Sequence, residues 1–183
     1  MDRTYLETFT DLIELVENSC YQEQRQKSLS SLSDDMIDAP IIEVINVFNR
    51  LPYCFTIQGC YGHFIFKGQT DLYNFEPLPA ENTIVRVEYK IAYVAFCIDN
   101  SLPGKSLLST LKQVALIDPD YIQFCSATWF WERQVNSYAL QVEPDRYKDK
   151  DKVKLDYHEA LHIQTVRAMF FTGLKERLRT LSG

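Results

Sequence analysis

The stretch that decides the fold is YCFTIQGCYGHFIF, residues Tyr53–Phe66. Its first six residues alternate, with an aromatic or aliphatic side chain at every second position, and this period of two predicts a β-strand with one buried face. The alternation stops at Gly59-Cys60-Tyr61-Gly62 and resumes at His63. Two glycines in four residues allow positive φ angles, so the sequence predicts a tight reversal and therefore a β-hairpin.

The tip of this predicted hairpin carries a thiol, a phenol and an imidazole. We expect a pocket for a small ligand here, with Cys60 and His63 as candidate catalytic residues. The candidate ligand-binding residues are their neighbours in the same stretch, Thr56, Gln58, Gly59, Tyr61 and Gly62. The alternative is an ordinary hairpin in which Cys60 is a small buried residue.

The composition predicts one globular domain over residues 1–183, because 46% of the residues are hydrophobic and 11 Tyr and 11 Phe supply a large core. The net charge of −6 argues against broad non-specific binding to nucleic acid. Local basic patches stay open at Lys148–Lys154 and Lys175–Arg179.

The five cysteines, the N-terminus and the hydropathy favour a cytoplasmic protein with no membrane partner. The cysteines are odd in number, widely spaced and without a CxxC pair, which is typical of reduced thiols. The first residues, MDRTYLETF, lack the apolar core of a signal peptide. No apolar run reaches the roughly 20 residues that span a bilayer.

Residues 1–50 are predicted to form a helical lead-in. Apolar residues at spacings of three and four predict a helix over Thr4–Gln26, ended by the serine-rich segment Lys27–Asp35. A second helix is predicted with Asp38 as its cap and Pro40 in its first turn, and it ends before Pro52.

Residues 51–143 are predicted to form a sheet with one crossing helix. The longest β-like run is Thr83–Asp99, which becomes apolar on both faces beyond Ala92 and is therefore expected at the centre of the sheet. The remaining expected elements are a loop at Gly68–Asn82, a turn at Asn100–Lys105, a helix at Ser106–Ile117, and strands at Ile122–Phe130 and Tyr138–Val142.

The last part is predicted to be a solvated, charged linker over residues 144–155 and a closing helix over residues 156–181. Helices first, then strands with one crossing helix, then a closing helix indicate an α+β fold. We expect a single domain with a mixed or mostly antiparallel sheet.

The first third of the chain resembles the tRNA wybutosine-synthesis methyltransferase family. The residues that carry the resemblance are Ser28–Asp35, the helix from Pro40, Asn49, Phe55-Thr56, Cys60 and Gly62. Cys60 and Gly62 match the core of the family's strand signature, F-x-T-x-S-S-C-[SA]-G-R, and the other residues occupy corresponding places in the order of elements. The resemblance implies a compact α+β fold, S-adenosylmethionine as a cofactor, and a small molecule, nucleotide or RNA bound near Gln58–His63.

This chain departs from the family signature at three places. Gln58 and Gly59 replace its two serines, and His63 replaces its arginine. The family's Gly-Gly-Lys-x-x-x-x-Trp segment has no counterpart in Lys67–Asn82. Loss of the planar guanidinium removes the best group for holding a phosphate or carboxylate, so the resemblance implies the fold and leaves methyltransferase activity open.

A second motif lies in the closing helix, where His158-Glu159-Ala160-Leu161-His162 matches HExxH. Residues four apart share a helix face, so both imidazoles can hold one zinc ion while Glu159 acts as general base of a hydrolase. His63 supplies the missing third ligand if this helix packs across the predicted hairpin. The alternative is a metal-free first turn in which Glu159 interacts with the helix dipole.

The aromatic excess suggests a third class of function, a non-catalytic homodimeric interaction protein. Trp129-Phe130-Trp131 with Tyr138 are suited to stacking RNA bases on a sheet, or to packing in a core or dimer interface. A protein that stays monomeric in light scattering at all concentrations would contradict the homodimer.

Overall fold

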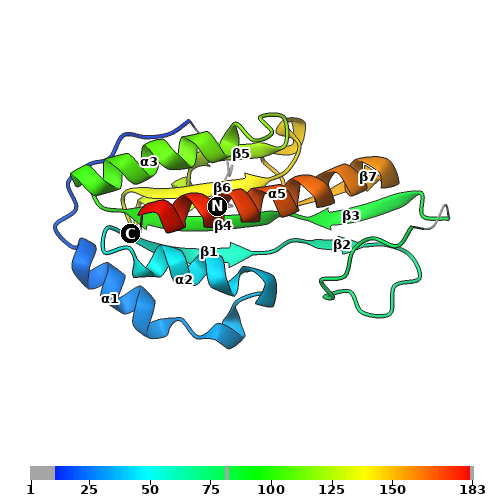
Figure 1. Cartoon of the computed structure of the whole chain (residues 1–183), viewed down its shortest axis with the longest axis horizontal. Helices are drawn as coiled ribbons and strands as arrows, with labels where there is room; N and C mark the ends of the chain where they lie inside the picture. Colours follow the sequence, from blue (N-terminus) through cyan, green and yellow to red (C-terminus); the bar gives the residue numbers. More distant parts are fainter. Residues whose placement is uncertain (1–10, 81–82, 182–183) are drawn as a thin grey trace, which may run out of the picture.

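The computed structural model describes residues 11–80 and 83–181, which are arranged around two antiparallel sheets (Figure 1). The larger sheet has the strand order β1-β4-β6-β5 and the smaller has the order β2-β3-β7. All pairings in both sheets are antiparallel. The strands are β1 (Cys54–Cys60), β2 (His63–Ile65), β3 (Arg86–Lys90), β4 (Ala92–Ile98), β5 (Ile122–Ser126), β6 (Ser137–Val142) and β7 (Lys152–Asp156).

Helices cover both faces of the larger sheet. On one face α5 packs between α2 and α3, with α2 on β1 and α3 on β5. On the other face, α1 packs on β1 and α4 packs beside β6. These helices are α1 (Tyr21–Ser31), α2 (Ile42–Arg50), α3 (Leu102–Ala115), α4 (Thr128–Trp131) and α5 (Tyr157–Leu181). Short 3-10 turns η1 (Asp34–Met36) and η2 (Ala39–Ile41) lie between α1 and α2, and η3 (Asp145–Tyr147) lies between β6 and β7. The predicted single α+β domain is confirmed.

The main core lies between the larger sheet and α2, α3 and α5. Strand β4 is central, as predicted, and is buried on both faces. The ring of Phe96 stacks on Phe48 of α2 with centroids 5.1 Å apart, and Leu111 of α3 and Phe170 of α5 fill the same core. The long apolar run therefore reports burial on both sides, because helices cover both faces of the sheet.

The predicted hairpin is wrong. Strand β1 pairs with β4 and β2 pairs with β3, so the two halves of the decisive stretch belong to different sheets. Figure 1 shows β1 and β2 following each other in the same direction, antiparallel to β3 and β4. The two glycines mark a break in a long strand and not a reversal, because positive φ at Gly62 (85°) bends the chain without turning it back.

The predicted helix over Thr4–Gln26 is also wrong. Residues 11–20 contain no helix, the segment before them lies outside the described residues, and α1 begins only at Tyr21 and includes most of the serine-rich segment. The backbone amides of Ile13 and Val16 donate to the side chains of Ser126 and Asn136 instead. Apolar residues at helical spacing here pack against the main core from an extended chain.

Three boundaries differ for tertiary reasons. The predicted turn at Asn100–Lys105 is the first turn of α3, which Ser101 caps. The end of the predicted strand Ile122–Phe130 is helical in α4. The charged segment 144–155 contains most of β7, whose Val153 and Leu155 are buried between exposed lysines. Pairing with β3 makes this mixed-charge run a strand.

Within residues 11–80 and 83–181, no helix combines the length and apolar content required to cross a membrane.

Candidate functional site

The candidate site lies at the break between β1 and β2. A register shift between Thr56 and Gln58 places one extra residue, Ile57, in β1. Such a bulge reverses which face the following side chains occupy. Gln58 and Cys60 therefore oppose Ala95 and Tyr93 on the sheet face that α5 does not cover.

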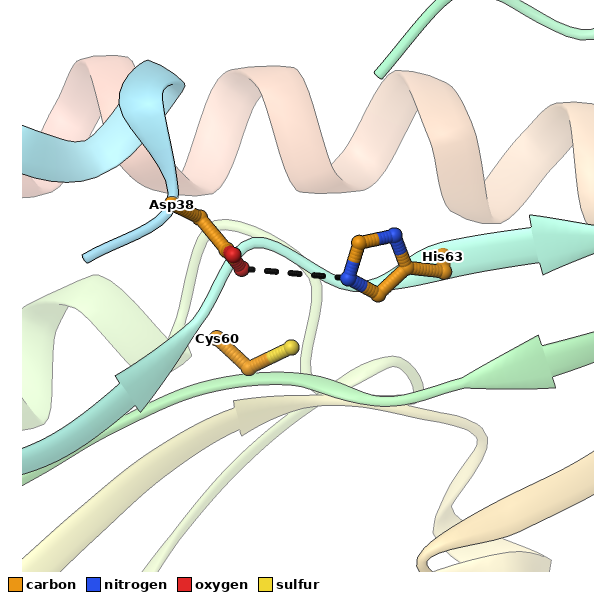
Figure 2. Close-up of side chains that lie close together, drawn as sticks. All are labelled: Asp38, Cys60 and His63. Atoms are coloured by element: carbon orange, nitrogen blue, oxygen red, sulfur yellow. Dashed lines mark ion pairs between the residues drawn. The ribbon is translucent and has the colours of Figure 1, made fainter. Parts of the chain in front are cut away.

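Three side chains with metal-ligand or nucleophilic chemistry meet at this break (Figure 2). One donor atom each of Asp38, Cys60 and His63 lies within 4.8 Å of the other two. Nε2 of His63 is 3.9 Å from Oδ2 of Asp38. Asp38 comes from the segment between η1 and η2, and it was predicted only as a helix cap. Its carboxylate makes no cap hydrogen bond and accepts one from the backbone N–H of Tyr61 at 2.6 Å instead.

The cysteine is a thiol and not an activated thiolate. Burial and, less strongly, the Asp38 carboxylate raise the pKa of Cys60 to about 11, although the Gly62 N–H opposes this by donating to Sγ at 3.4 Å. Burial lowers the pKa of His63, and Asp38 partly opposes that shift. In a catalytic Cys-His-Asp relay, the thiol and the carboxylate contact different ring nitrogens of the histidine. Here the carboxylate, the thiol and Nε2 all point into one common space, which is not the arrangement of a relay.

This chemistry predicts slow alkylation of the buried thiols. At pH 7.5 we expect one fast-reacting cysteine, the exposed Cys20, with Cys60 reacting about 100-fold more slowly because so little thiolate is present. Mass spectrometry of iodoacetamide-treated protein against time measures this. The fast phase of labelling should be absent in the Cys20→Ser variant. Fast labelling of Cys60 in the folded protein would contradict the predicted thiol.

A buried arginine that the sequence analysis missed holds the same segment. The side chain of Arg167, from α5, is 3% exposed, and it donates to the carbonyl oxygen of Gly62 at 2.9 Å. Its guanidinium also lies over the rings of Tyr61 and Phe64, 4.0 and 4.8 Å from their centroids. No sequence signal identified it, because a charge within an amphipathic helix is normally solvated.

A cavity of about 410 Å³ opens beside Cys60. It lies on the sheet face of Tyr93, where neighbouring strands carry the small side chains of Ala95, Ala139 and Cys125. The cavity is lined by Gln58, Cys60, Lys90, Ile91, Tyr93, Cys125, Gln141 and residues 148–151. The last four alternate basic and acidic residues at the rim.

Near the cavity lies a fully buried carboxyl group, also missed by the sequence analysis. Glu143 is 0% exposed, and the side-chain amide of Gln141, a cavity-lining residue, donates to it. Burial, together with the negative charges of Asp149 and Asp151, raises the pKa of Glu143 to about 9. It is therefore a neutral carboxylic acid at neutral pH.

The predicted site residues divide between this site and the scaffold. Gln58 and Cys60 line the cavity, and His63 joins the cluster with Asp38. Thr56 is 3% exposed and instead bonds through its N–H and hydroxyl to the side chain of Asn49. The other three shape the segment: a Cβ on Gly59 would face Ile41 and Ile45 of the core, the Tyr61 ring packs on Phe75 and Phe171, and Gly62 bends the chain.

The predicted three-histidine zinc centre is wrong. Within the part of the chain that the structure describes, Asp38, Cys60 and His63 form the only group of three such ligands, so His158 and His162 do not join His63. His158 packs against Tyr157, and His162 lies 3.3 Å from Asp118. The carboxylate of Glu159 accepts hydrogen bonds from Arg146 and Tyr121. The HExxH match is therefore the first turn of α5, which Asp156 caps.

The aromatic cluster does not form a base-stacking surface on the sheet. Trp129-Phe130-Trp131 lie in α4 and not in a strand of the sheet. Tyr138 is fully buried, and its ring meets Trp131 edge-on at 5.8 Å. Much of the aromatic excess fills the core, which removes its support for the homodimer while leaving that prediction open to light scattering.

Comparisons with known proteins add a distant structural likeness. No family model and no curated protein matches this sequence. The PH1069 protein from Pyrococcus horikoshii superimposes with a TM-score of 0.46 at 10% identity, covering 88% of this chain and 92% of that one. A hypothetical protein from Aeropyrum pernix gives a TM-score of 0.45 at 11% identity, covering 79% and 97%. At this level of similarity these structures do not indicate a function.

Proposed function

We propose that this protein binds a nucleoside or nucleotide in the cavity beside Cys60. The observation that carries the proposal is the cavity itself, whose volume of about 410 Å³ lies in the range typical of small-molecule sites. Its wall combines an aromatic ring with amide and ammonium groups, which is the mixture that a base joined to a polar or anionic group requires.

The lining assigns a role to each part of such a ligand. The ring of Tyr93 and the side chain of Ile91 offer an apolar surface to a base. The amides of Gln58 and Gln141 offer donors and acceptors for its edge. Lys90 is exposed at the end of β3, where its ammonium can approach a phosphate or carboxylate.

S-adenosylmethionine is the first compound to test, because of the resemblance to the wybutosine-synthesis methyltransferases. The signature of that family has an arginine where this chain has His63. Arg167 of α5 donates to the carbonyl oxygen of Gly62, one residue from that position, but it does not line the cavity. Methyl transfer is a separate step that binding does not require.

Isothermal titration calorimetry of the full chain tests the proposal. We expect S-adenosylmethionine, AMP or a short single-stranded RNA to bind with a Kd below about 1 mM, and Lys90→Gln to weaken an anionic ligand about 10-fold through loss of a charge-assisted contact. Tyr93→Leu should weaken all of them. The matched control is Lys112→Gln, which removes an exposed lysine from α3.

The outcomes separate the occupants. Binding of S-adenosylmethionine supports the methyltransferase-like version, binding of AMP alone supports a free nucleotide, and binding of RNA alone makes a nucleotide of an RNA chain the occupant. No heat with any of the three at millimolar concentration would reject the proposal, provided that circular dichroism shows folded protein.

A further inference from the structure

We infer that Asp38, Cys60 and His63 form a zinc-binding site. Oxygen, sulfur and nitrogen donors from these three residues converge at the break between the two sheets, with all three donor atoms within 4.8 Å of one another. Three protein ligands with an open fourth position are typical of zinc sites that act on a ligand or water. This site lies in a different part of the fold from the HExxH segment and shares only His63 with the earlier prediction.

The spacing of the donors is close to that of a metal-bound site. Zinc bonds of about 2.0 to 2.3 Å at tetrahedral angles put neighbouring donors about 3.3 to 3.6 Å apart. Nε2 of His63 and Oδ2 of Asp38 are already 3.9 Å apart. A contraction of at most about 1.5 Å, within reach of side-chain rotation, therefore brings the group to bonding geometry.

The backbone between the ligands is arranged to orient them. The N–H of Tyr61 donates to Oδ2 of Asp38, and the N–H of Gly62 donates to Sγ of Cys60. The imidazole of His63 is held by ring contacts with Tyr73 and Phe75, at 5.8 and 5.4 Å between centroids. Such contacts from the surroundings fix the direction of metal ligands and are part of a working site.

The charges and donor types favour zinc over the hard cations. One thiolate and one carboxylate together neutralise the charge of a divalent ion. Magnesium and calcium prefer sites made of oxygen alone, whereas a mixed sulfur and nitrogen set suits zinc. Binding transfers the thiol proton of Cys60 to solvent as the Zn–S bond forms.

The inference goes beyond the proposed nucleotide binding and does not depend on it. Cys60 also lines the cavity, so a ligand bound there would lie next to the metal. The ion alone is therefore the probe, without nucleotide, and protein first dialysed against a chelator is used in the nucleotide titrations above. The two proposals can then fail separately.

Titration of chelator-dialysed protein with Co²⁺ and then Zn²⁺ tests the site. We expect one equivalent of Co²⁺ with a near-ultraviolet sulfur-to-cobalt charge-transfer band that Zn²⁺ abolishes. Cys60→Ser should lose the band, and His63→Asn and Asp38→Asn should weaken Zn²⁺ binding at least 10-fold against a competing chromophoric chelator. Cys20→Ser and His158→Asn remove the same residue types from exposed positions and should bind as the unmodified protein does.

Thermal unfolding provides the second readout. Zn²⁺ should raise the Tm of the unmodified protein and of both controls, and raise the Tm of the three site variants much less. Absence of the band and of Zn²⁺ uptake in the folded protein would overturn the inference. So would full Zn²⁺ binding by both Cys60→Ser and His63→Asn, and circular dichroism establishes that each variant is folded before it is scored.

Discussion

Replacing Glu143 by glutamine is expected to stabilise the protein by about 5 kcal/mol at pH 8 and by about 1 kcal/mol or less at pH 5. Burial and the neighbouring Asp149 and Asp151 raise the pKa of Glu143 from 4.5 to about 9 in the folded state. Between these two values the unfolded chain has lost a proton that the folded protein still holds. Stability from this group is therefore complete at low pH and falls by up to about 1.4 kcal/mol per pH unit as the pH rises.

Glutamine is the matched replacement, because it keeps the shape and the acceptor for the Gln141 amide and cannot ionise. Urea unfolding of both proteins at pH 5, 6.5 and 8 gives the two free energies of unfolding at each pH. Only their difference is used, since His63, whose pKa is lowered, contributes equally to both. A difference that stays constant with pH would show that Glu143 titrates normally in the folded protein.

Gly62→Ala is expected to destabilise the fold by about 3 kcal/mol and to disrupt the Asp38–Cys60–His63 cluster. Two costs add at this position. The φ angle of 85° disfavours any L-residue by about 1 to 2 kcal/mol. A Cβ built there lies 2.9 Å from both the backbone nitrogen and the Cβ of Ala92, and overpacking of this kind costs about 1 to 3 kcal/mol.

Gly68→Ala separates the two costs. Gly68 also has a positive φ, 95°, but a Cβ there meets nothing within 4 Å. Chemical denaturation should therefore show a loss of only about 1 kcal/mol for Gly68→Ala. Equal losses for the two variants would contradict the close approach of β4 to Gly62. The cobalt titration of Gly62→Ala then reports whether the bend positions the metal ligands.

Asp38 shows what local patterns miss in a functional site. A sequence reading sees an aspartate ahead of a helix and assigns it to that helix. In the structure its carboxylate accepts a hydrogen bond from the backbone N–H of Tyr61, 23 residues later. The break in the strand leaves that N–H without a partner in either sheet. Arg167 and Glu143 are similar, since their burial depends on segments distant in sequence.

The sequence by itself determined the α+β class, the central position of β4, the closing helix and the break at Gly59–Gly62. Each rests on a local cause, either the periodicity of apolar residues or the backbone freedom of glycine. The tertiary structure alone decided that the break joins two sheets, that β7 forms within a charged segment, and that Asp38 meets Cys60 and His63. Strand pairing and side-chain convergence depend on contacts between distant segments, and neighbouring residues in the sequence do not encode those contacts.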